Sequence, residues 1–226
     1  VTAGDNLSLI LLDNGSIDRD ASLFPVSAIS LVNDVHAGND TANGGAGNSL
    51  IIGCLGDDSI DGGGAKNVIF GDSAEFTAGV YRSIDTGLGG ADTLTAGGDD
   101  EFIVGGFESD TVSVPSGTNV LFGDNALIET TATTLADPGL LTLAASIAPD
   151  QGASDAIQGG SGRDIIFGGF GGDTVHASGG DDVVFGDQGY ARAEAGAVIG
   201  LVSGEYESAG AFARSTVHGG VDAITA

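Results

Sequence analysis

Short apolar runs recur every nine residues along three stretches of the chain. In the clearest stretch, GGSGRDIIF (159–167), GGFGGDTVH (168–176) and ASGGDDVVF (177–185) each place an aliphatic residue at the eighth position. Ile166, Val175 and Val184 are therefore nine residues apart, and each follows a segment rich in glycine and aspartate. Three residues with a central aliphatic predict a very short strand, and the six residues before it predict a turn.

The same phase is kept in two earlier stretches. Residues 35–70 read VHAGNDTAN, GGAGNSLII, GCLGDDSID and GGGAKNVIF, and residues 87–122 read GLGGADTLT, AGGDDEFIV, GGFESDTVS and VPSGTNVLF. Each of the three stretches then finishes with Gly-Asp, at Gly71-Asp72, Gly123-Asp124 and Gly186-Asp187. Repetition at a fixed period is the sequence signature of a solenoid, in which stacked copies share one core.

The repeats divide the chain into blocks separated by inserts. Gly4-Asp5 reads as the tail of an earlier block, so we expect a fragment or one unit of a longer protein. We expect an insert at 1–34, repeat blocks at 35–72, 87–124 and 150–187, inserts at 73–86, 125–149 and 188–216, and the start of another block at 217–226.

Two nonapeptides supply two turns and two strands, so one coil of the predicted solenoid has 18 residues. Strands this short are unstable alone, but copies stacked about 4.8 Å apart pair along the solenoid axis. The aliphatic residue of each strand points inward and forms a thin core between two sheets. The predicted fold is therefore all-β: a parallel β-roll or β-solenoid interrupted by short β-rich inserts.

The two predicted sheets differ in the residues that flank each inward aliphatic, which point away from the core. On one sheet these residues are polar, as at Thr93 and Thr95, whereas on the other they are apolar, as at Val120 and Phe122. The second sheet is therefore expected to be buried on both faces, so something must cover it.

The inserts are the nearest candidates for this cover. We interpret them as hairpins or short strand pairs that fold back over the apolar sheet. Alternatively, the sheet packs on a neighbouring molecule and is an assembly surface. A stretch such as AEAGAVIGLVSG (193–204) could also be helical, and its periodicity does not decide between helix and strand.

Composition and charge narrow the function. The 41 glycines do not recur at every third position, which excludes collagen, and the many aliphatic residues argue against disorder. The chain has 32 acidic and 6 basic residues, for a net charge of −26, so nucleic acid is a poor partner. Acidity alone could serve solubility or halophilic adaptation. The placement of the acids in the repeat favours divalent cations as part of the fold.

Other classes of function find little support. Cys54 is the one cysteine, which excludes an internal disulfide, and it falls in a predicted turn. The apolar stretches at 7–12 and 139–148 are far too short to span a membrane. Acid pairs such as Asp57-Asp58 follow the repeat phase, so they read as turn residues and ion ligands rather than glycosidase carboxylates. The histidines do not cluster, and we expect no enzyme; they are His36, His176 and His218.

GGSGRDIIF and GGFGGDTVH resemble the RTX, or haemolysin-type calcium-binding, repeat, written G-G-x-G-x-D-x-U-x with U a large aliphatic. The resemblance extends over 35–72, 87–124 and 150–187. It implies a right-handed parallel β-roll that holds several Ca²⁺ ions between the turns of successive coils. It also implies export by a bacterial type I system and folding driven by calcium outside the cell.

The sixth residue of the repeat is the expected Ca²⁺ ligand, because Ca²⁺ prefers carboxylate and carbonyl oxygens. With 18 residues per coil, the partners on one side of the roll, the first flank, are Asp40 with Asp58, Asp92 with Asp110, and Asp155 with Asp173. On the second flank they are Ser49 with Asn67, Glu101 with Asn119, and Asp164 with Asp182. We expect strong sites on the first flank, and on both flanks in the third block.

The Ser49 and Asn67 position is expected to be empty or weak, since neither side chain is acidic. The block-ending aspartates lie one turn above first-flank turns, so they could complete further sites or be ordinary turn residues; they are Asp72, Asp124 and Asp187.

Three functions fit these features. The first is a structural or adhesive unit of a long secreted bacterial surface protein or extracellular filament, with calcium and copies of itself or neighbouring repeats as partners. The second is the export and folding module of a secreted enzyme or toxin. The third is a calcium-dependent surface-layer lattice protein. All three place the chain outside the cell or on its surface.

Overall fold

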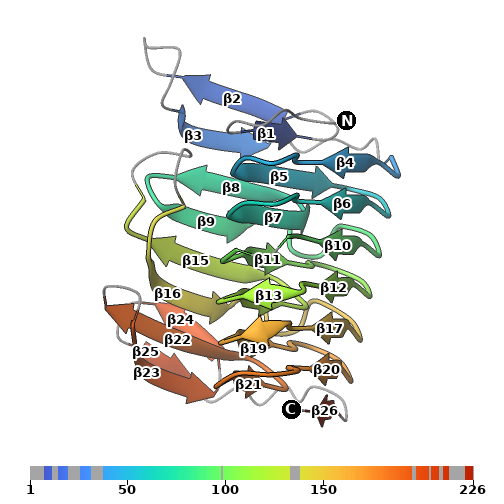
Figure 1. The fold of residues 1–226 in the computed structure, drawn as a ribbon. Helices are drawn as coiled ribbons and strands as arrows, with labels where there is room; N and C mark the ends of the chain where they lie inside the picture. Colours follow the sequence, from blue (N-terminus) through green and yellow to red (C-terminus); the bar gives the residue numbers. More distant parts are fainter. Residues whose placement is uncertain are drawn as a thin grey trace.

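The computed structural model describes residues 8–11, 15–19, 26–31, 38–97, 99–132, 138–194, 197–203, 205–208, 211–213 and 222–225 of the chain. The regular elements in these ranges are β-strands, and most belong to three large sheets that lie in layers (Figure 1). In the same ranges, no helix is long and apolar enough to cross a membrane. The predicted all-β fold is confirmed, and the parallel strands form a β-roll.

One of the two outer layers, which we call the polar sheet, has seven parallel strands. Its outward side chains are mostly polar, whereas the central aliphatic of each internal strand is buried. Its strands are β4 (Thr41–Asn43), β6 (Ser59–Asp61), β10 (Thr93–Thr95), β12 (Thr111–Ser113), β17 (Ala156–Gln158), β20 (Thr174–His176) and β26 (Ala223–Thr225).

The middle sheet also has seven parallel strands, and a core of inward aliphatics such as Ile51, Ile103 and Val175 separates it from the polar sheet. Phe102 pairs with Val120, which confirms the predicted coil of 18 residues. The strands are β1 (Ser8–Leu11), β5 (Ser49–Cys54), β7 (Asn67–Asp72), β11 (Phe102–Val104), β14 (Val120–Phe122), β19 (Ile165–Phe167) and β21 (Val183–Phe185).

Coil stacking continues across the inserts. Thr93 of β10 pairs with Ser59 of β6, although the insert after β7 separates them in sequence. In the same way, Ala156 of β17 pairs with Thr111 of β12. Each insert therefore leaves the roll at a first-flank turn and returns to the same turn, so the blocks form one uninterrupted stack.

The inserts build the third layer, an eight-stranded antiparallel sheet that we call the insert sheet. Residues 193–194 and 197–203 belong to its strands, so the helical alternative for 193–204 is wrong for them. A hairpin of β24 (Glu205–Ser208) and β25 (Ala211–Ala213) follows it. The strands of the insert sheet are β2 (Gly15–Arg19), β3 (Val26–Leu31), β8 (Ala74–Thr77), β9 (Val80–Ser83), β15 (Ala126–Thr130), β16 (Leu141–Ser146), β22 (Gly189–Glu194) and β23 (Ala197–Ser203).

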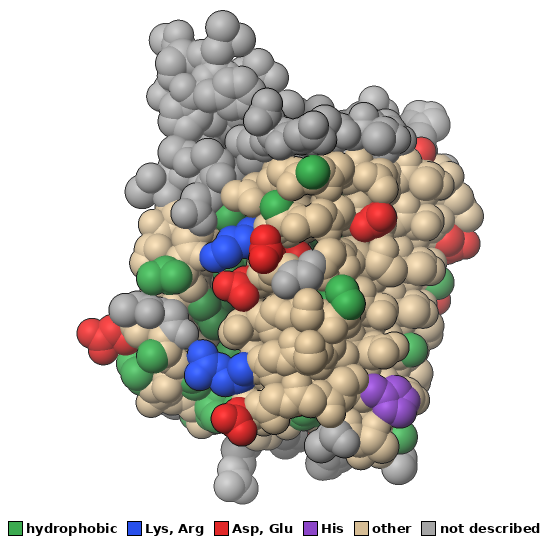
Figure 2. Space-filling model, viewed as in Figure 1, with side chains coloured by type: hydrophobic (Ala, Val, Ile, Leu, Met, Phe, Trp, Pro, Cys, Tyr) green, Lys and Arg blue, Asp and Glu red, His purple; other side chains and the backbone are tan. Residues whose placement is uncertain are grey.

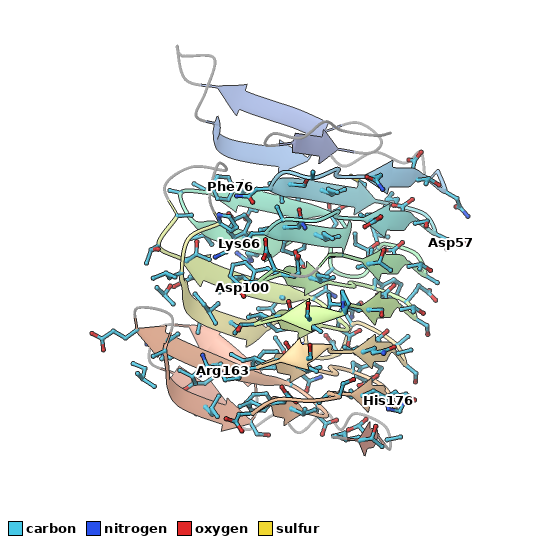
Figure 3. All side chains as sticks on the ribbon, viewed as in Figure 1. Asp57, Lys66, Phe76, Asp100, Arg163 and His176 are labelled. Carbon is cyan, nitrogen blue, oxygen red and sulfur yellow. The ribbon has the colours of Figure 1, made fainter. Side chains whose placement is uncertain are left out.

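A second core lies between the middle sheet and the insert sheet. Phe122 and Phe167 stack with their ring centroids 4.4 Å apart, and both are almost fully buried. Phe76 of β8 (Figure 3) and Tyr81 of β9 belong to the same core. The apolar sheet is therefore covered by the chain's own inserts, as the first of the two sequence interpretations expected.

Cys54 differs from its predicted place in a turn. It is the last residue of β5, with a positive φ of 82°, and its side chain is buried in the core under the insert sheet. The strand outlasts the three-residue repeat here because β5 and β7 stay paired as far as Cys54 and Asp72.

Candidate metal site: a carboxylate ladder in the glycine turns

Each coil has two turns, so the stacked coils form two columns of turns, one on each flank of the roll. The first-flank column carries the sixth-position aspartates that the sequence singled out, and it also includes Asp222, which was not proposed as a ligand. In order along the stack these residues are Asp40, Asp58, Asp92, Asp110, Asp155, Asp173 and Asp222.

These aspartates form a hydrogen-bonded ladder. The backbone N–H of each residue donates to the Oδ1 of the aspartate one coil further on. The Asp58 N–H lies 2.7 Å from Asp92 Oδ1, and the Asp92 N–H lies 2.7 Å from Asp110 Oδ1. The contact between Asp58 and Asp92 spans 34 residues and crosses an insert, so within-block pairing by 18 residues describes only part of the ladder.

The second carboxylate oxygen defines the candidate site. It is buried and accepts no hydrogen bond in five ladder residues within the described part of the chain: Asp58, Asp92, Asp110, Asp155 and Asp173. Leaving a buried carboxylate oxygen without a partner is costly, and native proteins rarely do so without an ion or water. These five oxygens therefore fit a bound cation.

Glycine makes room for that cation at the first position of each turn. A Cβ on Gly105 would lie 2.4 Å from Asp110 Oδ2 and 2.0 Å from the carbonyl oxygen of Gly123. A Cβ on Gly53 would meet the Oδ2 of Asp58 and the next carbonyl in the same way. A carboxylate oxygen and a backbone carbonyl thus face one small space, and these are the hard oxygen ligands that Ca²⁺ prefers.

The negative charges of the buried ladder carboxylates must be neutralised. Burial, together with the charge of Asp155, raises the pKa of Asp110 to about 11. Burial also raises the pKa of Asp155 to about 8 and that of Asp92 to about 7. These side chains cannot all be ionised at neutral pH unless cations lie between them, since each charge is both desolvated and close to a like charge.

The second flank is a mixed ladder. Its backbone contacts repeat the same pattern, for example from the Asn67 N–H to Glu101 Oε2 at 2.8 Å. The asparagines, however, supply donors of their own, and the Asn119 amide donates to the carbonyl of Ser116 at 3.2 Å. Among the described residues of this flank, only Glu101 and Asp164 have a buried side-chain oxygen without a hydrogen-bond partner. The asparagine rungs therefore supply amide donors where the first flank has carboxylates, and an ion between Asp164 and Asp182 stays a prediction.

Asp72 and Asp124 have a different role from the ladder aspartates. The carboxylate of Asp72 accepts the N–H of Gly90 at 3.1 Å and the N–H of Phe107. Asp124 likewise accepts the N–H groups of Ala153 and Phe170. Gly90 and Ala153 lie beyond the insert that follows each aspartate, so the carboxylate closes the first-flank turn across the insert.

Burial raises the pKa of both Asp72 and Asp124 to about 9, so without a cation nearby each carboxyl holds a proton at neutral pH. Asp187 is exposed, and residues 214–221, where its insert ends and the next block begins, lie outside the described part. A ligand role for the three block-ending aspartates stays a prediction.

Within the described residues, no three His, Cys, Asp or Glu side chains form a group that could hold a metal by themselves. The ladder accounts for this, because it supplies one sixth-position side chain per coil, so other ligands of a bound ion would have to be backbone carbonyls. His176 is exposed and contacts the hydroxyl of Thr225, whereas His36 and His218 lie outside the described ranges.

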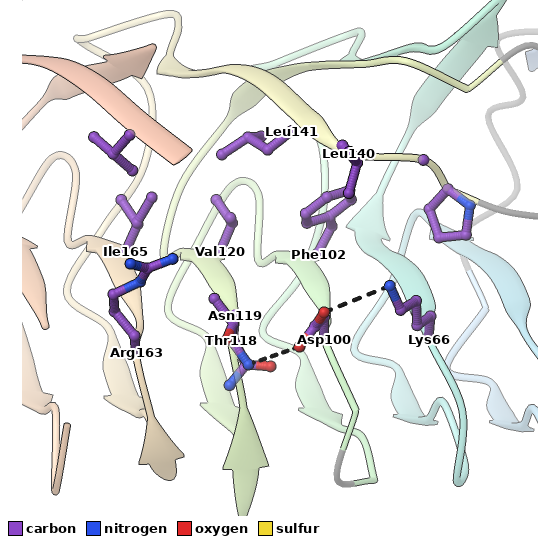
Figure 4. A pocket seen from close by; sticks show the side chains of 13 residues that line it. Lys66, Asp100, Phe102, Thr118, Asn119, Val120, Leu140, Leu141, Arg163 and Ile165 are labelled. Atoms are coloured by element: carbon purple, nitrogen blue, oxygen red, sulfur yellow. Dashed lines mark hydrogen bonds and ion pairs between the residues drawn. The ribbon is translucent and has the colours of Figure 1, made fainter. Parts of the chain in front are cut away.

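A separate pocket of about 100 Å³ lies between the second-flank turns and the insert sheet (Figure 4). Phe102, Val120 and Ile165 line its apolar floor. At the rim, Lys66 forms an ion pair with Asp100 at 3.5 Å. The described residues that line the pocket include one acid, Asp100, and no histidine or cysteine.

On the face shown in Figure 2, basic side chains lie along this boundary next to acidic ones. The turns that form the candidate site itself are the glycine turns of the repeat.

Comparison with known proteins agrees with this geometry. A family model described as the RTX calcium-binding nonapeptide repeat, in four copies, matches residues 36–69, 86–112 and 153–190. Six of the seven ladder aspartates lie in these ranges, and Asp222 lies beyond them. No curated protein and no solved structure matches the chain significantly.

Proposed function

Since the chain belongs to the family of RTX calcium-binding nonapeptide-repeat proteins, we propose that it is a calcium-stabilised structural or adhesive unit of a secreted protein. Repeats of this family bind calcium in general. In this chain the ions would lie in the first-flank column, held by the ladder aspartates Asp40, Asp58, Asp92, Asp110, Asp155 and Asp173. On the second flank they would lie between Asp164 and Asp182.

One observation carries this proposal: the row of buried aspartate Oδ2 atoms that have no hydrogen-bond partner and face glycine carbonyls. A bound Ca²⁺ would supply positive charge between carboxylates that otherwise repel each other. The chain itself supplies the oxygens, orients each carboxylate through the N–H of the preceding coil, and excludes water by burial. Binding free energy then becomes folding free energy, because the unfolded chain has no such site.

The proposed location of the chain outside the cell rests on its net charge and its buried acids. With a net charge of −26 and a column of buried acids, the chain would be unfolded or weakly folded where free calcium is scarce. It would fold after export into a calcium-rich medium. Export by a type I system and an extracellular or cell-surface location are therefore part of the proposal.

The layered fold supports a structural rather than a catalytic role. Three sheets run along one axis, and the described residues offer glycine turns, apolar cores and ion ligands rather than a nucleophile with its base. Such a rod suits a filament or a long surface protein. The alternatives are a folding module beside a catalytic domain and a unit of a surface lattice, and electron microscopy of the native source would distinguish them.

The proposal is tested by circular dichroism during a calcium titration, with magnesium as the control ion. We expect ordered β signal to appear with Ca²⁺ and not with the same concentration of Mg²⁺, and equilibrium dialysis to count several bound ions. A chain that is equally folded in chelator, with no bound calcium, would show that the aspartates are only turn formers.

A further inference from the structure

The pocket between the second-flank turns and the insert sheet lies inside the stack, away from both of its ends. Its apolar floor consists of Phe102 of β11, Val120 of β14 and Ile165 of β19. These three strands are consecutive in the middle sheet, and β7 and β21 flank them on either side. The floor is therefore bounded by described strands in both directions along the stack.

The pocket remains because the insert sheet covers the middle sheet unevenly. The hairpin of β15 and β16 turns between Thr130 and Leu141, and the end of this turn lies over the second-flank side of the roll. Phe122, which lies deeper under the insert sheet, is 1 % exposed, whereas Phe102 is 8 % exposed. Leu140, on the opposite wall, is 47 % exposed. Apolar surface thus stays open where the cover ends.

The floor of the pocket is a row of side chains along the stack axis. Neighbouring strands lie about 4.8 Å apart, so the row from Phe102 to Ile165 is about 10 Å long. Leu140 and Leu141 face this row from the insert sheet (Figure 4). With a volume of about 100 Å³, the space fits one unbranched chain that lies along the axis, and it is too small for a lipid with two chains.

The rim of the pocket differs in charge between its two ends. The fifth residues of four successive second-flank repeats line it, and in order along the stack these are Lys66, Asp100, Thr118 and Arg163. Lys66 is paired with Asp100 at 3.5 Å, and Asp100 also accepts the Thr118 N–H at 3.0 Å. Arg163 is exposed and forms no ion pair with any described residue, Asp181 in the next coil included. An anion in the pocket would therefore be attracted at the Arg163 end and repelled at the Asp100 end.

This position of two cations is unusual for so acidic a chain, since only 6 residues are basic against 32 acidic ones, and two of the six line this pocket. We propose that the pocket binds an unbranched aliphatic monocarboxylate. The carboxylate lies on the Arg163 guanidinium, which can donate two parallel N–H···O bonds to it. The chain lies along Val120 and Phe102, where its methylenes displace water from the apolar floor. This binding site goes beyond the calcium-stabilised structural role and needs only the folded chain.

The test measures binding of hexanoate to the full chain in saturating calcium, by saturation-transfer NMR and calorimetry. Acetate controls for contact of a carboxylate with calcium itself, and hexanol and hexylamine carry the same chain without a negative charge. We expect hexanoate to bind more tightly than all three. From butanoate to hexanoate, binding should strengthen about fourfold for each methylene that becomes buried. Hexanol that binds as tightly as hexanoate would overturn the carboxylate contact, and a chain that binds none of these compounds would overturn the site.

Replacing the arginine tests where the carboxylate lies. Arg163→Gln should weaken hexanoate binding roughly fivefold, the loss expected for one partly exposed ion pair, and should leave hexanol binding unchanged. Arg82→Gln is the matched control, because it removes an exposed arginine of the insert sheet that does not line the pocket. Equal hexanoate affinity in Arg163→Gln and the wild type would overturn the proposed orientation.

A charge at the mouth of the pocket tests where the chain lies. Leu140→Glu should abolish hexanoate binding, and it should leave the fold intact because Leu140 is 47 % exposed. Leu88→Glu is the matched control, since Leu88 is also 47 % exposed and lies outside the pocket. Circular dichroism in calcium checks that both variants are folded. Hexanoate binding by Leu140→Glu at the wild-type affinity would overturn the site.

This proposal and the calcium proposal fail in different ways. A chain that folds with calcium but does not bind hexanoate overturns the carboxylate site and leaves the calcium site in place. A chain that is folded in chelator and binds hexanoate there overturns the calcium role and supports the carboxylate site.

Discussion

Replacing Asp110 by asparagine should have opposite effects with and without calcium. Asp110 lies in the middle of the first-flank ladder and is 2 % exposed. Its Oδ1 accepts the Asp92 N–H at 2.7 Å, and its Oδ2 has no partner. Asparagine has the same shape, so its amide oxygen can keep the first contact. Its amide nitrogen would face the Gly123 carbonyl, much as Asn119 donates to Ser116 on the second flank.

The size of the effect in chelator follows from the raised pKa of Asp110. In chelator at pH 7 the folded chain holds a proton on Asp110, because burial raises the pKa of that carboxyl from 3.8 to about 11. The unfolded chain releases this proton, so folding must take it up again, at about 1.4 kcal/mol for each pH unit above the unfolded pKa. From 3.8 to 7 this amounts to a penalty of about 4 kcal/mol. Asp110→Asn removes the penalty, so it should stabilise the calcium-free fold by up to that amount.

In saturating calcium, the effect of Asp110→Asn on stability should reverse. The variant lacks one carboxylate ligand, so it should bind fewer ions and gain less free energy of unfolding from saturating calcium than the wild type does. The assay is urea unfolding followed by circular dichroism at pH 7, in chelator and in calcium. If the wild type is already unfolded in chelator, the stabilisation shows as ordered signal that only Asp110→Asn retains.

Asp150→Asn is the matched control, because it removes the same charge from an exposed turn and should change neither condition much. The reasoning is refuted if Asp110→Asn is less stable than the wild type in chelator. It is also refuted if calcium stabilises both proteins equally.

Two further predictions concern protons and glycine. In chelator the free energy of unfolding should fall as the pH rises from about 4 towards neutrality, because the folded ladder binds protons that the unfolded chain has released. Burial raises the pKa of Asp92 to about 7 and of Asp155 to about 8, and each such carboxyl contributes about 1.4 kcal/mol per pH unit within that window. Calcium should flatten the profile and release protons on binding, which titration calorimetry in two buffers would measure; stability that rises with pH in chelator would contradict the raised pKa values. Gly105→Ala should sharply reduce calcium binding and cost several kcal/mol, roughly the cost of an overpacked core position, because its Cβ would lie 2.0 Å from the Gly123 carbonyl oxygen. Gly64→Ala is the control, since a Cβ there meets no atom within 4 Å, and equal calcium affinity in the two variants would argue against the cradle.

The repeat phase made much of the roll predictable. Ile157, Ile166 and Val175 are nine apart in the sequence, and each is buried in the core between the polar and middle sheets. The apolar residues that flank the middle-sheet aliphatics, such as Val120 and Phe122, correctly predicted a sheet buried on both faces. A strand and a turn of nine residues are local structures, so local sequence carries this information.

The pairing across inserts was not predictable in the same way. Asp58 and Asp92 are neighbours only because the intervening hairpin leaves the roll and returns at one turn, and no spacing rule expresses that return. For the same reason the sequence could place Asp72 near first-flank turns but could not show that its carboxylate bridges the gap to Gly90.

The sequence by itself determined that this chain is an all-β roll of nine-residue repeats with acidic turns suited to calcium. Each repeat contains the residues that form its own turn, its own strand and its own inward position. Only the tertiary structure decided that the inserts cover the apolar sheet and that the first-flank aspartates form one ladder. It also decided which carboxylate oxygens are left buried without partners. Those properties depend on contacts between residues a coil or more apart, where the energy comes from burial and from hydrogen bonds that local sequence does not specify.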